Sequence, residues 1–558
     1  MRLTVQARPS MPRFFAIVLL AVATMSLCVS CTRSSPQASL RRTQSWTIPG
    51  VLRIGVRQEP DTLNPLLAQQ EIDVDISMFW AGYLIGIDDR NHPLPELAVA
   101  VPSLENGGIS KDGRTIVYRL RHGVRWHDGA PFTADDVIFT WRAVMNADNP
   151  VPSRVGYELI QSIERRSDDT VIVRLRRPYA PFVSIFLSVS ASYPYCVLPK
   201  HMLARYHDVN HAAFNTMPLG TGPYRVVRYE PHNLIRFEAN AGYWRGRPRL
   251  KQIDMRIVPN DNTLATLMRT HELDLYFRVP HIVAKTLRGR EGVTIVSSPF
   301  TRYVDIGFNT RSDLLSDVRV RRAIALATDK RALNVKVALG ADIITDSDQP
   351  RFSWAHADNL PQYAYDPRRA TALLEAAGWH LGADGVRRKG GSALRLNLAG
   401  ASGDSVSIQA RELLQAQWRQ VGVDSDIKSY PSNILFASLP DGGVEMTGHY
   451  DAVLESFANG ADPDESVLFE CRWQPPAGEN VYRFCDRALD QAEEAALRSN
   501  VEATRKAAYA QVQNILASEL PILPLWFERY DFAVNSNLRN FVPAHVASPF
   551  WNTWMWQI

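Results

Sequence analysis

Alternation of polar and apolar side chains marks the clearest predicted strand of this chain. Residues 114–120 alternate with the period of a half-buried strand. A His-Gly pair then turns the chain, residues 124–127 continue as extended backbone, and an Asp-Gly pair turns it again. The pattern predicts two extended segments joined by short turns.

The hydrophobic period then changes to that of a helix. Thr133 is placed to cap this helix, and Asp136 occupies the reciprocal capping-box position. Asp135 and Asp136 put negative charge at the positive end of the helix dipole. The apolar residues expected on one face are Val137, Trp141 and Val144.

Helices and strands alternate in the second half of the chain. Asp329 and Asp366 are predicted helix caps, and Pro367 follows at a first helical position, where proline is tolerated. Strands are predicted at 394–398 and 423–427, separated by a helix at 406–420. Such alternation is typical of an α/β lobe.

The string from residue 118 to 145, YRLRHGVRWHDGAPFTADDVIFTWRAVM, closely resembles the signature segment of the family-five extracellular solute-binding proteins. These are receptors that deliver peptides, nickel chelates and similar solutes to ATP-driven importers. Three further motifs resemble elements of the same family: PDTLNP at 60–65, GTGPY at 220–224 and YWRGRP at 243–248. The resemblance covers the chain from about residue 50 to Trp556.

The resemblance implies a mixed α/β architecture. The expected fold is the bilobal type II fold of periplasmic binding proteins, with an additional third lobe and a ligand cleft between two lobes. Lobe I is expected to be discontinuous, lobe II to be the extra lobe of peptide-binding members, and lobe III to hold the later helices and strands. The expected boundaries are 47–93, 220–308 and 534–558 for lobe I, 94–219 for lobe II and 309–533 for lobe III.

The N-terminus has the composition of an export signal. Three arginines precede an apolar run at 14–27, which ends in Cys28-Val29-Ser30-Cys31. Ser30-Cys31 fits a bacterial lipoprotein signal, with Cys31 as the lipidated residue, although Cys28 stands where leucine is usual. An ordinary secretory signal or an uncleaved anchor is the alternative. Residues 32–46 are polar and are expected to form a flexible tether to the membrane.

Composition and charge limit the possible functions. The 558 residues include 62 basic and 58 acidic side chains, so the net charge is only +4, and no basic run interleaved with aromatics indicates a nucleic-acid surface. In an oxidising compartment, Cys471 and Cys485 are the most plausible disulfide, with two separate buried thiols as the alternative. Cys196 is expected to be a small buried hydrophobe.

The common catalytic motifs are absent from the sequence: there is no nucleophile elbow, no His-Glu-x-x-His and no phosphate-binding loop. His207 and His211 are spaced to share a helical face and hold a metal, but the polar residues between them favour a solvated loop. No catalytic residue, metal or cofactor is therefore expected.

The loop at 455–464 follows an apolar strand and resembles the family loop in which an Asp, four residues before the proline, pairs with the free amine of a bound peptide. Here that position is Asn459, which lacks the charge that makes such a bond strong. Asp462 either substitutes for this charge or caps the segment that follows. The residues expected to contact the ligand are Asp61, Asn64, Tyr303, Phe457, Asn459, Asp462 and Trp526.

Taken together, these features predict an exported, membrane-tethered receptor of an ABC importer, at the periplasm or cell surface. It is expected to be a monomer that binds a peptide or peptide-like solute and partners a permease and ATPases. An oligosaccharide or a metal chelate is the alternative solute. An exported hydrolase, or a sensory or chaperone-like protein with the same fold, is the alternative class.

Overall fold

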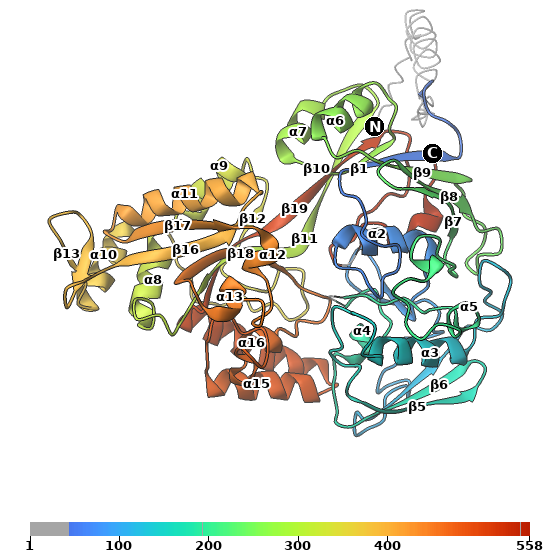
Figure 1. Ribbon diagram of the computed structural model, residues 1–558, viewed down its shortest axis with the longest axis horizontal. Coiled ribbons are helices and arrows are strands. Elements are labelled where there is room, and N and C mark those ends of the chain that lie inside the picture. Colours follow the sequence, from blue (N-terminus) through green and yellow to red (C-terminus); the bar gives the residue numbers. More distant parts are fainter. Residues whose placement is uncertain (1–43, 192, 547) are drawn as a thin grey trace, which may run out of the picture. The chain divides into compact units, whose positions relative to one another are not determined.

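The computed structural model describes residues 44–191, 193–546 and 548–558 (Figure 1). By its internal contacts the chain divides into two compact units, Met1–Thr47 and Ile48–Ile558, and all of the described helices and strands belong to the second. The predicted signal segment with Cys31, and residues 32–43 of the predicted tether, lie outside the described residues.

A mixed sheet of eleven strands organises the second unit, within the described residues. Its strands are β1 (Val51–Val56), β7 (Tyr224–Glu230), β8 (Leu234–Ala239), β9 (Gln252–Ile257), β10 (Leu275–Val279), β11 (Val293–Phe308), β12 (Ile343–Ile344), β16 (Arg395–Ala401), β17 (Asp424–Tyr430), β18 (Ala452–Ala458) and β19 (Ile522–Asn535). Their order is β17-β16-β18-β11-β19-β10-β1-β9-β8-β7, with β12 paired to β19 beside this path. Parallel and antiparallel pairs both occur, which confirms the predicted mixed α/β class.

Two long strands connect the halves of this sheet. β11 has 16 residues and pairs with β19 from Val293 to Gly307, but the register shifts between Pro299 and Tyr303. At one end β19 pairs with β10, and at the other end β11 pairs with β18. β11 and β19 therefore belong to both halves, and the irregular register lies where they pass from one to the other.

Helices cover the half of the sheet that contains β16, β17 and β18. They are α8 (Val318–Ala327), α9 (Lys330–Val337), α10 (Pro367–Ala376), α11 (Ser405–Arg419), α12 (Ser432–Leu435), α13 (Val444–Thr447), α14 (Ser466–Phe469), α15 (Arg487–Arg498) and α16 (Glu502–Glu519). The Asp329 and Asp366 side chains accept hydrogen bonds from backbone amides of α9 and α10, so both predicted caps are confirmed. A small sheet of β13 (His380–Leu381), β14 (Arg387–Lys389) and β15 (Ser392–Ala393) follows α10.

The other half of the large sheet carries α2 (Glu71–Trp80), α6 (Asp261–Arg269) and α7 (His281–Leu287), with β2 (Ile85–Ile87) paired to β3 (Pro93–Pro95). Residues 94–219 add a separate sheet in the order β4 (Thr115–Arg119), β6 (Thr170–Leu175), β5 (Ile160–Ser167), together with α3 (Ala134–Met145), α4 (Phe182–Ile185) and α5 (Lys200–Leu203). In the part of the chain that the structure describes, three short 3-10 helices lie at Ala213–Asn215, Cys471–Trp473 and Thr553–Met555.

The structure confirms the predicted start of α3. The Thr133 amide donates to the Asp136 carboxylate at 2.9 Å, and the same buried carboxylate accepts the Trp126 indole N–H and the Lys200 amide. The extended segment predicted at 124–127 does not form a strand. It makes one isolated antiparallel bridge, between Arg125 and Pro131.

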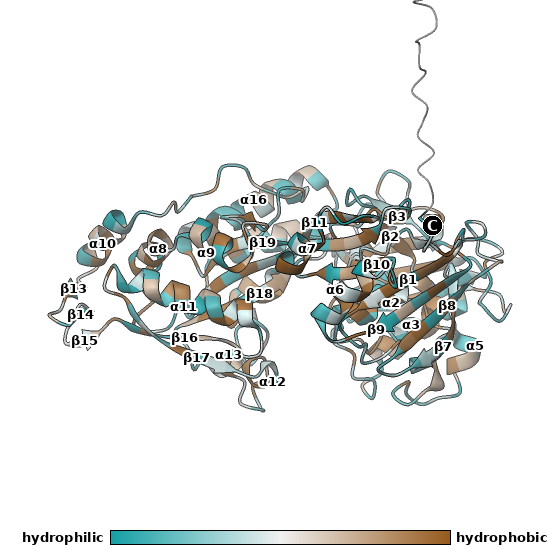
Figure 2. Cartoon of the chain, turned by 90° about the horizontal axis from the view of Figure 1, so that it is seen from above, coloured by the Kyte–Doolittle hydropathy of each residue, from teal (hydrophilic) through white to brown (hydrophobic). Residues whose placement is uncertain are grey.

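One hydrophobic core continues from the large sheet into residues 94–219. It includes Trp80, Tyr118, Trp126 and Phe237, and Phe79 in the same core packs on Phe550 with ring centroids 4.9 Å apart. In Figure 2 hydrophobic residues concentrate on the central strands. Phe550 and Trp556 are fully buried here, so aromatic residues near the C-terminus contribute to the core.

The GTGPY segment is held against the end of α2. The Gly222 amide donates to the Trp80 carbonyl oxygen at 2.9 Å. A Cβ atom on Gly220 would lie 1.7 Å from that oxygen, so only glycine fits this position. The contact joins the end of the 94–219 segment to the large sheet.

Candidate functional site

A cavity of about 360 Å³ lies between segments from both halves of the molecule. Its wall comes from the start of α2, residues 153–157, 184–191 and 193–195, the irregular parts of β10 and β11, the end of β18 and the loop that follows it. This volume falls within the range of about 300–1,000 Å³ that is usual for small-ligand sites. The cavity is therefore the candidate binding site.

Aromatic side chains make much of the wall: Tyr157, Tyr179, Tyr193, Tyr195, Phe300 and Phe457. Tyr157 and Tyr195 pack with ring centroids 5.7 Å apart. The Tyr195 hydroxyl donates to the Ser153 carbonyl oxygen at 2.7 Å, which fixes the ring. Such rings offer apolar contact area whose orientation is already set.

A group of paired charges occupies another part of the wall. Glu71 and Asp75 are four residues apart on α2 and so share one face of the helix. Arg278 reaches both carboxylates, Glu71 at 2.5 Å and Asp75 at 3.0 Å. Arg302 also pairs with Glu71, and its Nε lies 3.6 Å from Glu528. Both guanidinium groups are thus neutralised by carboxylates of the protein.

Irregular strand geometry explains how the two arginines reach the cavity. β10 loses register with β19 between Tyr276 and Val279, and Arg278 lies there with φ of 52°. Arg302 lies within the register shift of β11. Bulges of this kind redirect side chains that a regular strand would point elsewhere.

The loop after β18, residues 459–465, is called the β18 loop below. The Asn459 side chain donates to the Asp348 carbonyl oxygen at 2.8 Å, and its backbone oxygen accepts from the Thr301 hydroxyl at 2.7 Å. Asp462 is paired with Arg505 at 2.7 Å. The Tyr179 hydroxyl donates to Asp464 at 2.8 Å, so the β18 loop also contacts residues 94–219.

Of the residues predicted to contact the ligand, Phe457, Asn459 and Asp462 line the cavity. The structure does not place the side chains of Asp61, Asn64, Tyr303 and Trp526 in this wall.

At those four positions the structure shows other uses of the side chains, and their contact with a ligand stays a prediction. Asn64 is fully buried, and its amide joins the Asn215 side chain to the Leu66 backbone. Tyr303 and Trp526 are buried in hydrophobic cores beside β19. The Asp61 backbone amide donates to the Asp73 carboxylate, and the same loop lines the cavity at Pro65, Ala68, Gln69 and Gln70.

Sequence reasoning missed Glu71, Arg278, Arg302, Glu479 and the tyrosines of the wall. The spacing of Glu71 and Asp75 was a visible signal of one acidic helix face. Nothing local distinguishes Arg278 or Arg302, because their position depends on irregular strand pairing across the sheet.

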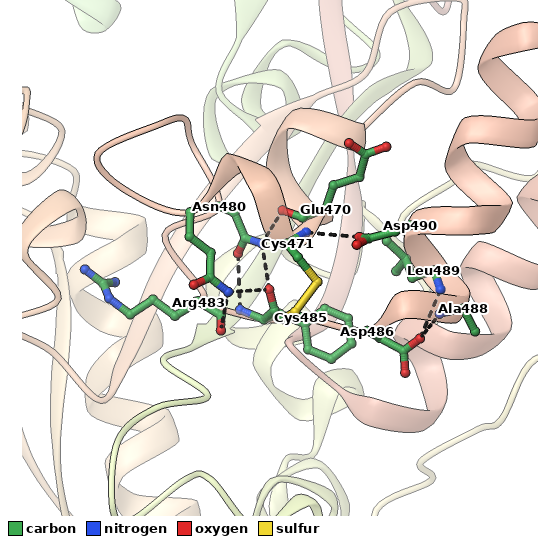
Figure 3. Close-up of a disulfide and its surroundings, with 11 residues drawn as sticks. Glu470, Cys471, Asn480, Arg483, Cys485, Asp486, Ala488, Leu489 and Asp490 are labelled. Atoms are coloured by element: carbon green, nitrogen blue, oxygen red, sulfur yellow. Dashed lines mark hydrogen bonds between the residues drawn. A yellow bond between two sulfur atoms is a disulfide. The ribbon is translucent and has the colours of Figure 1, made fainter.

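Cys471 and Cys485 form the predicted disulfide (Figure 3). Cys196 is buried, and this burial raises the pKa of its thiol. His207 pairs with Asp148, at 2.8 Å. Across residues 44–191, 193–546 and 548–558, no group of three or more His, Cys, Asp or Glu side chains is arranged to hold a metal.

His281, at the start of α7, bridges two carboxylates beside the connecting strands. Its Nδ1 lies 2.9 Å from Asp531 on β19, and its Nε2 lies 3.3 Å from Asp342 in the segment before β12. Hydrogen bonds to Asp342 and Asp531 raise the pKa of His281 to about 9. The imidazolium therefore ties β12 and β19 to α7 at neutral pH.

Replacing His281 with glutamine is expected to lower the free energy of unfolding by about 2 kcal/mol at pH 6, the scale of hydrogen bonds to charged groups. The native pKa is above the unfolded value of about 6.5, so this stabilisation is complete below pH 6.5 and disappears as pH rises through about 9. Urea unfolding at pH 6 and pH 9.5 measures the difference. His211→Gln, at an exposed position, is the control; an equal loss for His281→Gln at both pH values would contradict the charged bridge.

A cavity between two halves that are joined by long connecting strands is an arrangement typical of a solute receptor. The model for "Bacterial extracellular solute-binding proteins, family 5 Middle" matches residues 92–472, and the chain belongs to this family. The family assignment confirms the predicted class and the prediction that the protein is not an enzyme.

Individual relatives match over most of their length. The chain is 24% identical to the oligopeptide-binding protein AppA of Bacillus subtilis over 530 residues, which cover 94% of each chain. It is 27% identical to the dipeptide-binding protein of Escherichia coli, covering 76% of this chain and 80% of that one. The crystal structure of NikZ from Campylobacter jejuni in complex with Ni(L-His) shares the fold, with a TM-score of 0.77, 24% identity, and coverage of 92% and 100%.

The described part of the chain contains no helix that is both long and apolar enough to cross a membrane.

Proposed function

We propose that this protein is the solute-binding component of an ABC importer and that it binds a short peptide or peptide-like solute in the cavity without catalysis. The observation that carries the proposal is the cavity wall, which combines six aromatic rings with charged side chains, most of which are paired within the protein. Such a wall orients a small solute by surface contact and a few polar groups. Relatives named for oligopeptide and dipeptide binding support the same solute class.

Phe457, Asn459 and Asp462 are proposed to contact the solute, because they face the cavity from the β18 loop and the end of β18. Phe457 supplies apolar area. Asn459 supplies an uncharged polar group in place of the Asp expected from the family. Asp462 acts mainly through its pair with Arg505, which fixes the loop that carries it.

The proposed partners are a permease and ATPase subunits, met by the monomer at the outer face of the membrane. Lipidation of Cys31 would tether the protein there through residues 32–46. Intact mass of the mature protein tests the tether: an N-terminus other than acylated Cys31 contradicts it.

A metal chelate is the second candidate solute. It is favoured by Asn459, since an uncharged amide does not provide the anchor expected for a free peptide amine. The likeness to NikZ gives fold support only.

Native mass spectrometry of the purified protein, followed by thermal-shift screening with peptides, chelates and sugars, tests the proposal. A bound solute raises the melting temperature with its concentration. Peptides are expected to do so. If a chelate or a sugar stabilises the protein and no peptide does, the peptide assignment fails.

A further inference from the structure

The balance of charge on the cavity wall leaves one carboxylate without a partner. Five carboxylate side chains line the wall: Glu71, Asp75, Asp462, Asp464 and Glu479. The first four take part in the pairs Glu71–Arg278, Asp75–Arg278, Asp462–Arg505 and Tyr179–Asp464. The Glu479 side chain has no hydrogen bond or ion pair with any described residue.

The loop that carries Glu479 is rigid on both sides of it. The disulfide between Cys471 and Cys485 closes this loop, and Asn480 is fully buried directly after Glu479. The Asn480 side chain donates to the carbonyl oxygens of Glu470 at 3.1 Å and Phe484 at 2.8 Å (Figure 3). Glu479 is therefore exposed on a fixed support, the arrangement of a preorganised contact.

Tyr193 is the aromatic neighbour of this carboxylate. It comes from the 94–219 segment and is 48% exposed although it lines the cavity. Tyr193 and Glu479 line the same cavity, and burial, followed by the charge of Glu479, raises the pKa of the Tyr193 phenol. A carboxylate beside an aromatic face attracts ammonium and guanidinium groups by charge and by cation–π contact.

The surroundings of Glu479 strengthen such an attraction. Although Glu479 is exposed overall, partial burial of its carboxyl by neighbouring atoms raises the pKa of that group. Charges interact more strongly at a partly buried group. Arg278 and Arg302, the arginines of the described wall, are paired with Glu71 and do not compensate Glu479.

We propose that Glu479 and Tyr193 form a subsite for a positively charged group of the solute, an ammonium or a guanidinium. The inference rests on the proposed function, because it assigns part of the same cavity. The subsite takes over the role of charged anchor that Asn459 lacks. The preferred solutes are then peptides or peptide-like molecules with a cationic group at this end.

The test compares tripeptides that differ only in one side chain, lysine against norleucine, each with a free and an acetylated N-terminus. In the acetylated pair the lysine side chain carries the sole positive charge, and isothermal titration of the wild-type protein is expected to give about tenfold tighter binding of this lysine peptide than of its neutral norleucine partner, equivalent to about 1.4 kcal/mol. Glu479→Gln is expected to remove this preference and to leave the affinity for the neutral member unchanged. Glu291→Gln, an exposed glutamate outside the cavity wall, is the matched control.

The outcomes separate the subsite from the proposed function. If peptides bind and Glu479→Gln keeps the cationic preference, or the wild type has none, the subsite is wrong and the proposed function stands. If no peptide binds, the peptide assignment fails. The binding of arginine and spermidine is then measured by titration and compared with that of citrulline, whose side chain is uncharged. Binding of either cation that Glu479→Gln weakens about tenfold still supports the subsite; failure of both cations to bind overturns it.

Discussion

Replacing Arg505 with methionine is expected to lower the free energy of unfolding by about 3–5 kcal/mol, the cost of leaving a buried charge without its partner. The Arg505 guanidinium lies 2.7 Å from the Asp462 carboxylate, and about nine tenths of both side chains is buried. Its Nε also donates to the Ala496 carbonyl oxygen, and its Cζ atom lies 5.1 Å from the centroid of the Trp354 ring. Methionine fills part of the space but supplies none of these bonds.

Urea unfolding of Arg505→Met and Arg498→Met measures this cost. Arg498 lies on α15, is 62% exposed and pairs with Glu494 one helical turn away, so its loss is expected to cost less than about 1 kcal/mol. Adding Asp462→Asn to Arg505→Met is expected to recover part of the lost stability, since the unpaired charge is then removed. Similar losses for the two arginine variants would contradict a buried pair beneath the β18 loop.

The pair also shows what the sequence can reveal about this loop. Asp462 stands before a proline in a polar loop, and its composition alone favours either a ligand charge or a helix cap. The structure gives it a third role, because Arg505 reaches it from a helix 43 residues later. Local patterns report bonds between neighbours, and this bond depends on how α16 packs.

The predicted helix caps were accurate because each cap is a bond between residues that are close in the sequence. Asp329, Asp366 and Asp136 each bond a backbone amide within three residues, so the sequence contains both partners of each bond. The β18 loop was found through its resemblance to a family motif. Arg278 and Arg302 were not found, since Glu71 lies 207 residues from Arg278 and the contact depends on register shifts in β10 and β11.

The surroundings of Asn459 explain why an uncharged residue occupies this position. Glu465 and Asp348 lie beside it, and burial raises the pKa of both carboxyls, to about 6 for Asp348. The amide of Asn459 bonds the Asp348 carbonyl oxygen without adding a further negative charge. An aspartate at this position would join a region already rich in buried acids, so the uncharged residue suits the protein interior as well as the cavity.

This acidic interior leads to an expected dependence of stability on pH. Asp305 on β11 is fully buried, pairs across the sheet with Glu455 on β18, and has no hydrogen-bond partner among the described residues for either carboxylate oxygen. Burial, followed by the charge of Glu455, raises the pKa of Asp305, and burial also raises the pKa values of Glu455 and Glu445. The native protein therefore retains protons that the unfolded chain has lost.

The free energy of unfolding is expected to fall as pH rises above about 4, where unfolded carboxyls lose their protons, by about 1.4 kcal/mol per pH unit for each proton retained. The fall continues until pH reaches the raised native pKa values. Asp305→Asn keeps the shape of the side chain but cannot ionise. It is expected to reduce the fall between pH 5 and pH 8 by up to about 4 kcal/mol, one retained proton over three pH units.

Urea unfolding at pH 5, 6.5 and 8 measures this difference between the wild type and Asp305→Asn. Asp313→Asn, at an exposed position five residues before α8 in the segment 309–317, is the matched control and is expected to follow the wild type at every pH. Because other groups titrate equally in both proteins, the change in slope isolates the contribution of Asp305. If the free energy of unfolding falls with pH equally for Asp305→Asn and the wild type, Asp305 does not keep an additional proton in the native protein. That outcome would contradict the prediction.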